Sequence, residues 1–283
     1  MDSIGGVILG MIDKSMKNVK ISTHDYEQDG LIYCGNCHTP KQKWIHIFDR
    51  DIKVGISCKC TKEKQEAEKK AQEDYARHLK IDKNRRSSGL TVEQQSHTFD
   101  VAISNSYNEK QVRYCRNYAN KFDEMFKRSQ GLLLYGPPGT GKSFLSSCIA
   151  NELLGRGLLV KVTSTISVVG HTSFYNDDEH SEYIRKITLP DLLVLDDLGA
   201  ERNTDFALER VHDIVEYRVA SGKPMIVTTN YSLEQMKNEA DIRKSRTYDR
   251  IFKCCFPMPF TGGSFRKQNA NNSYADIKRM LEG

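Results

Sequence analysis

Apolar runs separated by polar segments dominate the chain after residue 130. Runs of this length, without alternation, are typical of strands buried on both faces of a parallel sheet. Between them stand longer stretches whose apolar residues recur every three or four positions, which favours helices. The pattern therefore predicts an α/β fold in which a parallel sheet is flanked by helices. The expected strands lie at 132–135, 158–163, 191–195, 224–229 and 254–258.

Among the helices, the longest amphipathic pattern runs from about residue 108 to 128, with Val112, Cys115 and Phe122 on its inner side. Shorter helical patterns are expected around 205–220 and 241–252. The polar stretch 173–182 is expected to be an exposed insertion. It is either a plain surface loop or a loop that faces a partner or a central channel.

The pattern changes before residue 90. Two short strands are expected at 44–48 and 51–56, whereas residues 1–30 carry little beyond a possible short helix at 4–17. Residues 61–80 place opposite charges three and four positions apart, which predicts a solvated connecting helix or, as an alternative, a helix that docks on a partner. A linker rich in Lys, Arg and Ser is expected at 82–89.

The domain organisation predicted from these patterns has three parts. A small amino-terminal domain spans 1–60, a connecting helix and linker span 61–89, and the main α/β domain spans 90–283. A chain of 283 residues is long enough for a large domain with its own core plus a small one.

Charge and composition narrow the function classes only slightly. A formal net charge of +5 and a pI near 8.6 permit nucleic-acid binding without requiring it. The apolar stretch 5–12 is too short to span a bilayer and does not follow a basic region, so we expect a cytoplasmic protein without a membrane partner.

One glycine-rich segment, 136–143, has the P-loop spacing of Gly-x-x-x-x-Gly-Lys-Ser between an expected strand and an expected helix. Glycines allow the backbone to wrap around phosphate oxygens, and the helix adds its positive end. The lysine would reach the β and γ phosphates, and the serine would help to hold Mg²⁺. The predicted ATP-binding residues are Gly136, Pro137, Pro138, Gly139, Thr140, Gly141, Lys142 and Ser143.

Paired acids follow a second expected strand, at Asp196 and Asp197, and Asn230 follows a third. The carboxyl ends of parallel strands form the ligand-binding edge of such a sheet, so these side chains are expected beside the P-loop. Asp196 would hold Mg²⁺, Asp197 would orient or deprotonate the attacking water, and Asn230 would contact the γ-phosphate or that water.

Four cysteines cluster before residue 61, as Cys34, Cys37, Cys58 and Cys60. A C-x2-C pair and a C-x-C pair suit tetrahedral Zn²⁺, because each short spacing lets two thiolates grip one ion. His46 or His38 in place of one cysteine stays open, as does a redox or unliganded cluster. A bound zinc would stabilise a segment that is too small for a core of its own.

Together these motifs resemble those of AAA+ ATPases in the DnaC/DnaI helicase-loader group, to which the transposition helper IstB is similar. The motifs that carry the resemblance are 136–143, 195–201, 228–230, 248–251 and 264–266.

The resemblance implies roles that the residues alone do not establish. It implies that Arg250 is a finger inserted into a neighbouring subunit's ATP and that Arg266 senses phosphate within its own subunit. It further implies self-association through ATP interfaces, single-stranded DNA as a ligand, and a zinc domain that engages the replicative hexameric helicase. ATP and ADP, Mg²⁺ and Zn²⁺ are the implied cofactors.

The resemblance therefore favours a slow ATPase that loads the helicase onto single-stranded DNA during replication initiation. Two alternatives remain. An IstB-like transposition helper would share each ATPase motif, although the cysteine cluster argues against it. A nucleotide-gated adaptor that never hydrolyses ATP is favoured only by Asp197, where most ATPases of this type have glutamate.

Overall fold

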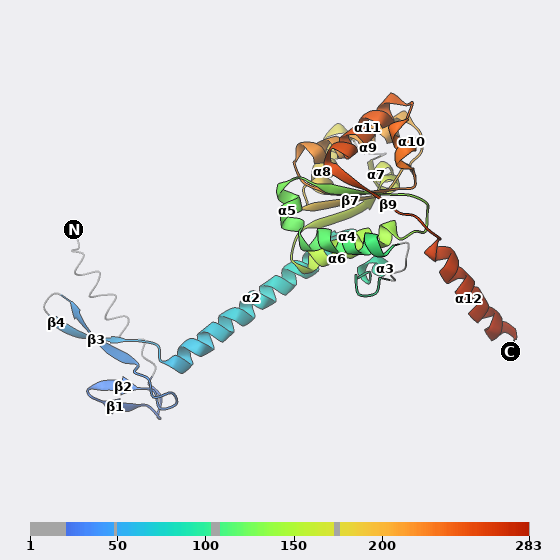
Figure 1. Ribbon diagram of the computed structural model, residues 1–283. Coiled ribbons are helices and arrows are strands. Elements are labelled where there is room, and N and C mark those ends of the chain that lie inside the picture. The colour runs from blue at the N-terminus through green and yellow to red at the C-terminus, as the bar shows by residue number, and fades with distance from the viewer. Residues whose placement is uncertain (1–20, 48–49, 103–107, 173–175, 283) are drawn as a thin grey trace, which may run out of the picture. The chain divides into compact units, whose positions relative to one another are not determined.

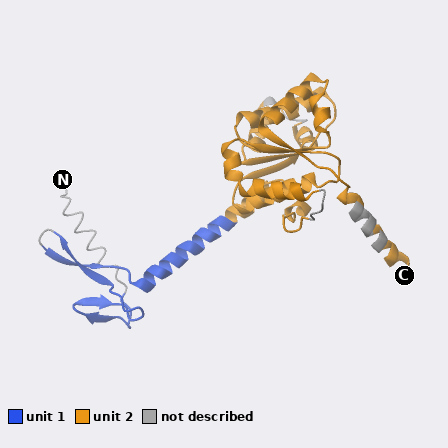
Figure 2. Cartoon of the chain, viewed as in Figure 1, with its two compact units in different colours: residues 1–78 blue, residues 79–283 orange. Residues whose placement is uncertain are grey.

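The computed structural model describes residues 21–47, 50–102, 108–172 and 176–282. It divides the chain into two compact units, residues 1–78 and 79–283 (Figure 2). The helix predicted at 4–17 lies outside the described residues. Within the described part, no helix is both long enough and apolar enough to cross a bilayer.

A five-stranded parallel sheet forms the centre of the second unit, in the order β6-β7-β8-β5-β9. This confirms the predicted α/β fold. Side chains of β5 alternate between two cores, since Leu132 and Leu134 pack on one face and Leu133 on the other, which explains the unbroken apolar run. The strands are β5 Gly131–Tyr135, β6 Val160–Ser164, β7 Leu192–Leu198, β8 Met225–Thr229 and β9 Cys255–Pro259.

Helices cover both faces of this sheet (Figure 1). One core lies beneath α4 and α6, and the other beneath α7, α8, α9 and α11. The helices of this unit are α3 Val92–Gln95, α4 Glu109–Asn120, α5 Phe122–Lys127, α6 Lys142–Gly155, α7 Thr165–Thr172, α8 Asp177–Thr188, α9 Asp205–Ala220, α10 Leu233–Lys237, α11 Ile242–Cys254 and α12 Phe265–Glu282.

Two predictions about local structure in this unit were wrong. The single helix expected from 108 to 128 is broken at Lys121, whose φ and ψ of −99° and 22° leave the helical region. The expected insertion at 173–182 contains the start of α8. A capping box between Asn176 and Glu179 begins that helix, and Ile184 and Ile187 bury its inner face.

The expected linker at 82–89 is also largely helical, because α2 runs from Lys59 to Ser87. Its last turn is held on the second unit by Asn84, whose side-chain amide donates to the carbonyls of Gly157 and Leu158, each at 3.2 Å. The helix stops where the Ser88 carbonyl accepts from the backbone N–H of Val162. A charged, solvated sequence thus continues as helix because its end is bonded to the sheet.

In its described residues, the first unit has two antiparallel hairpins. One joins β3 (Gln42–Ile47) and β4 (Arg50–Gly55), close to the two strands that were predicted. The other, β1 (Tyr26–Gln28) with β2 (Leu31–Tyr33), was not predicted. Asp29 and Gly30 form its turn with φ of 50° and 73°, the conformation that an Asp-Gly pair favours.

A buried guanidinium joins α9 to the start of two strands. Arg218 has no solvent exposure, and its nitrogens donate to the carbonyls of Thr188, Pro190, Asp191 and Pro224 at 2.5–3.2 Å. These carbonyls end α8 and precede β7 and β8, where helical and sheet bonding leave them unpaired.

We therefore expect Arg218→Met to lower the free energy of unfolding by about 3 kcal/mol or more, because several buried carbonyls lose their donors. Arg185→Met, at an exposed position of α8, is the control and should stay within about 0.5 kcal/mol. Urea unfolding of both variants measures the difference. Equal midpoints for Arg218→Met and the parent would contradict the assigned role.

Candidate functional site

The P-loop follows β5 directly and ends where α6 begins at Lys142. Gly139 and Gly141 have φ of 81° and 98°, which only glycine adopts readily. A Cβ on Gly139 would lie 2.1 Å from the Ser264 hydroxyl, so the loop packs tightly against the chain that leads into α12. The backbone N–H of Phe265 donates to the Gly139 carbonyl at 2.9 Å, which brings the start of α12 onto the loop.

Lys142 is 5% exposed, and its ammonium group lies inside the loop. It donates to the carbonyls of Gly136 and Pro137 at 2.7 and 2.8 Å and to the side-chain oxygen of Asn230 at 3.0 Å. Burial lowers the pKa of Lys142, and the charges of Asp197 and Asp196 oppose that effect. An ammonium group held in this way can bind an anion that enters the loop.

The paired acids lie at the carboxyl end of β7, beside the P-loop. Asp196 accepts hydrogen bonds from the hydroxyls of Ser143 and Thr228 at 2.9 and 2.6 Å. Burial raises the pKa of Asp197, as does the charge of Asp196. The backbone of Asp197 has φ of 55°, in the left-handed region. Non-glycine residues in this strained conformation cluster at functional sites.

Sequence reasoning missed Thr228. Its hydroxyl accepts from the backbone N–H of Asp197 at 2.9 Å while it donates to Asp196, so one side chain of β8 positions both acids. The register between β7 and β8 shifts between Leu195 and Leu198, which brings the acids to this hydroxyl. Thr228 belongs to the motif 228–230, but the motif did not assign it this role, because threonine is ordinary within a strand.

A cavity of about 520 Å³ opens over the loop. Asn230 and Arg266 line it together with P-loop residues and Asp197, so the structure brings these predicted residues together. Sequence reasoning also missed the opposite wall, which comes from the chain after α2. The residues of that wall are Thr91, Glu93, Gln94, His97 and Val101.

This wall is firmly attached to α6. The Asn151 side chain donates to the carbonyls of Gln94 and His97 at 2.7 and 2.8 Å. The centroids of the His97 and Phe144 rings lie 4.5 Å apart, and burial lowers the pKa of His97 while the charge of Glu93 opposes that effect. The cavity therefore has a charged end at the P-loop and a side that carries the His97 and Phe144 rings, which suits phosphates joined to a base.

Arg250 is the predicted residue that stays apart from this group. It projects from α11, and its Nε lies 2.8 Å from a carboxylate oxygen of Glu216 on α9. The side chain is about half exposed and does not line the cavity of its own chain. A role for Arg250 at ATP consequently requires a second copy of the chain.

The four predicted cysteines meet in the first unit, where their sulfur atoms all lie within 4.8 Å of one another. Cys60 lies 3.5 Å from Cys34 and 3.3 Å from Cys58. Four thiolates around Zn²⁺ at about 2.3 Å would stand about 3.8 Å apart, so the group is compatible with a zinc site. Hydrogen bonds from the Thr39 hydroxyl and the Cys60 backbone lower the pKa of Cys37 to about 5, which favours the thiolate.

Neither histidine that was left open as a ligand joins the group. His38 contacts the Tyr26 hydroxyl at 3.3 Å, and His46 pairs with Asp51 at 2.8 Å on the other hairpin. Asp25 supports the turn between Cys34 and Cys37. Its carboxylate accepts from Lys41 and from the Gly35 backbone at 2.5 and 3.1 Å.

Comparison with known proteins decides the family. IstB-like ATP-binding proteins match residues 62–273, which is more than half of the chain. The chain belongs to this family. The match spans α2 and the whole nucleotide site, so the family's ATP binding agrees with the cavity, and Ser143 and Asp196 are the residues that would hold Mg²⁺ there.

Curated relatives include the helicase loaders. The chain is 30% identical to the replicative helicase loader DnaC of Escherichia coli over 43% of this chain and 49% of DnaC. It is 32% identical to the Escherichia coli protein YdaV over 57% of this chain and 65% of YdaV. The matches thus span 49% and 65% of the lengths of these two relatives. The match to DnaI of Bacillus subtilis is 22% identical but covers 90% of this chain and 84% of DnaI.

Solved structures confirm the fold. A DnaI crystal structure matches with a TM-score of 0.53 at 24% identity, covering 62% of this chain and 96% of that one. A DnaC helicase loader structure matches with a TM-score of 0.52 at 22% identity, covering 60% and 100%. The arrangement of the sheet and its helices is thus the fold of these DnaI and DnaC structures.

We expect Thr228→Val to slow ATP turnover by about 10-fold to 100-fold, because the acids lose a shared hydrogen-bond partner worth about 1–3 kcal/mol. Thr228→Ser keeps the hydroxyl and should retain most of the rate. Steady-state hydrolysis and nucleotide affinity are measured on both variants. A Thr228→Val protein that turns over ATP as fast as the serine variant would contradict the role.

Metal content tests the cysteine group. The purified chain should carry about one zinc, and Cys34→Ser should lose it and leave the first unit more sensitive to protease. Cys254→Ser, outside the group, is the matched control and should keep the metal. The zinc assignment is rejected if the unaltered protein holds clearly less than one zinc or if Cys34→Ser retains it.

Proposed function

We propose that this protein is an ATP-dependent loader that binds a hexameric replicative DNA helicase and places it on single-stranded DNA. The supporting observation is that one chain carries both the assembled P-loop site and the four-cysteine group. The match to the loader DnaI also covers 90% of this chain. The first unit, held by zinc, is the part that engages the helicase.

Within the site, each side chain has a task that its position permits. Lys142 neutralises the β and γ phosphates, and Mg²⁺ held by Ser143 and Asp196 supplies further charge compensation when bound. Asp197, whose pKa is raised, accepts a proton from the attacking water, and Asn230 orients that water. Arg266 contacts the γ-phosphate from the start of α12 in the same chain.

Self-association completes the site. Arg250 of one copy reaches the γ-phosphate bound by the next, so ATP holds an assembly together and hydrolysis loosens it. The protein acts as a switch rather than as a fast enzyme, since Asp197 is shorter than the usual glutamate. The alternative is a nucleotide-gated adaptor that does not hydrolyse ATP, and it would be rejected by measurable ATP turnover.

A transposition helper is the second candidate, because the family takes its name from IstB and one relative is described as an ATP-binding protein in an insertion sequence of Mycobacterium tuberculosis. That relative matches only 36% of this chain at 26% identity, against 90% for DnaI. Affinity purification from the native host decides between the two, since a loader retains the helicase and a helper retains a transposase.

Arg250→Ala should reduce ATP turnover by about 10³-fold, the usual size of an arginine-finger effect, and leave nucleotide binding unchanged. Arg246→Ala, exposed on the same helix, is the control and should keep the rate. Mixing Arg250→Ala with Lys142→Ala should restore activity, because one chain supplies the intact P-loop and the other supplies the arginine. A fully active Arg250→Ala protein, or a mixture that stays inactive, would reject the finger.

A further inference from the structure

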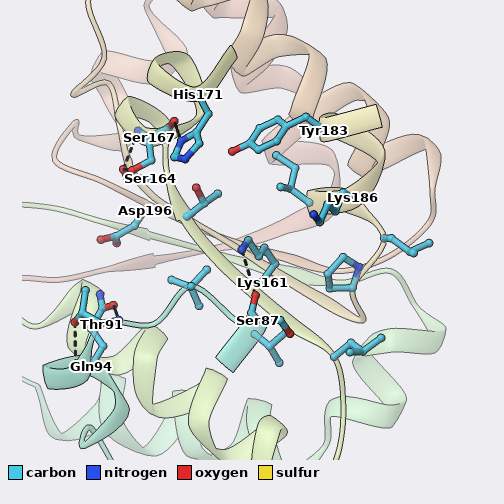
Figure 3. A pocket seen from close by; sticks show the side chains of 18 residues that line it. Ser87, Thr91, Gln94, Lys161, Ser164, Ser167, His171, Tyr183, Lys186 and Asp196 are labelled. Atoms are coloured by element: carbon cyan, nitrogen blue, oxygen red, sulfur yellow. Dashed lines mark hydrogen bonds between the residues drawn. The ribbon is translucent and has the colours of Figure 1, made fainter. Parts of the chain in front are cut away.

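A second groove runs along β6, one edge strand of the sheet, and of its lining residues the mechanism above uses Asp196 alone. It has a volume of about 780 Å³, larger than the nucleotide cavity of about 520 Å³. Figure 3 shows its walls, with His171 and Tyr183 on one side, Thr91 and Gln94 on the other, and Lys161 between them. We refer to this space, lined by 18 residues from segments 87–94, 159–171 and 183–196, as the β6 groove.

The charge of the β6 groove is unbalanced. Lys161 and Lys186 both line it, and burial lowers the pKa of Lys161, as does the nearby charge of Lys186. Among the described residues that line the groove, one is acidic, and this Asp196 already accepts hydrogen bonds from Ser143 and Thr228. Lys161 donates to the Ser87 carbonyl at 3.2 Å, which leaves its positive charge uncompensated. Two neighbouring ammonium groups beside one carboxylate that is already hydrogen-bonded favour an anion as the occupant.

Flat rings and hydroxyl groups lie near these charges. The rings of His171 and Tyr183 stack with centroids 5.9 Å apart and an interplanar angle of 11°. Ser164 and Ser167 stand beside them on the same wall, and the floor towards Ile187 is apolar. An aromatic wall next to paired lysines is the combination that binds a base and its phosphate without reading its sequence.

We propose that the β6 groove is a second binding site for nucleoside phosphate units, separate from the P-loop. The unit comes either from a single strand of nucleic acid or from a free nucleotide. The greater volume of the groove favours more than one unit and hence the single strand. The choice of a single strand as the source rests on the proposed loader function, whereas the choice of a free nucleotide does not.

The β6 groove also adjoins the nucleotide cavity. Thr91 and Gln94 line both spaces, and a capping box between them begins α3. The Gln94 carbonyl is bound to Asn151 of α6, the helix that carries Lys142. Nucleotide at the P-loop and the occupant of the β6 groove consequently share one wall, and the affinity for each should depend on the other.

The test compares Lys161→Ala/Lys186→Ala with Lys127→Ala/Lys237→Ala, a matched pair of lysines outside the groove, in the full chain. With MgADP saturating the P-loop, a fluorescein-labelled oligothymidine should bind the groove variant about tenfold more weakly than the control. For the groove variant, the slope of log binding constant against log salt concentration should be smaller in magnitude by about 1.4, since two phosphate contacts are lost. Tyr183→Ala should weaken binding by about tenfold through the lost stacking.

A count of bound ADP by calorimetry distinguishes the two sources. One ADP per chain together with weakened oligothymidine binding assigns the single strand. Two ADP per chain, of which the groove variant loses one, assign the free nucleotide. The remaining P-loop ADP shows that each variant is folded, and Lys186→Glu repeats the test at an exposed position.

The proposal is overturned if the groove variants match the control in both oligothymidine affinity and ADP count. Retention of the helicase is measured on the same variants. A chain that still binds helicase but shows no groove effect refutes the groove alone, whereas loss of helicase binding by the unaltered chain refutes the loader function.

Discussion

The site depends on the placement of one buried ammonium group. Lys142 is held by two P-loop carbonyls and by Asn230. Burial lowers the pKa of Lys142, whereas the charges of the paired acids raise it. A desolvated charge is tolerated only where its partners are fixed in advance. Three neighbouring strands, β5, β7 and β8, provide those partners, because their carboxyl ends meet at one edge of the sheet.

That constraint explains which groups of residues could be placed side by side from the sequence. The P-loop and the acid pair, Asp196 and Asp197, are local patterns, and their chemistry requires them to follow buried strands directly. The four cysteines were predicted for the same reason, since two short spacings fix four thiolates. Thr228 escaped prediction because its contact with both acids depends on the shifted register between β7 and β8. The wall at Thr91–Val101 escaped because its place beside the P-loop depends on Asn151, far along the chain.

Two of the errors in the helices share one cause. A polar or charged sequence was interpreted as loop or linker at 173–182 and 82–89, yet both contain helix. In each case a few buried groups decide the structure, Ile184 and Ile187 in α8 and Asn84 in α2. The correction to α2 bears on the site, because the segment that follows this helix lines both the nucleotide cavity and the β6 groove.

The measurement that tests this account most directly is calorimetric titration of the purified full chain with ATP in the presence of magnesium. The arrangement of Lys142, Ser143 and Asp196 predicts uptake of ATP at the P-loop with a favourable enthalpy, because charge-assisted hydrogen bonds form to the phosphates. It further predicts that the heat disappears when AMP replaces ATP, since the β and γ phosphates make these contacts. A folded chain that takes up no ATP, or that binds AMP equally well, would contradict it.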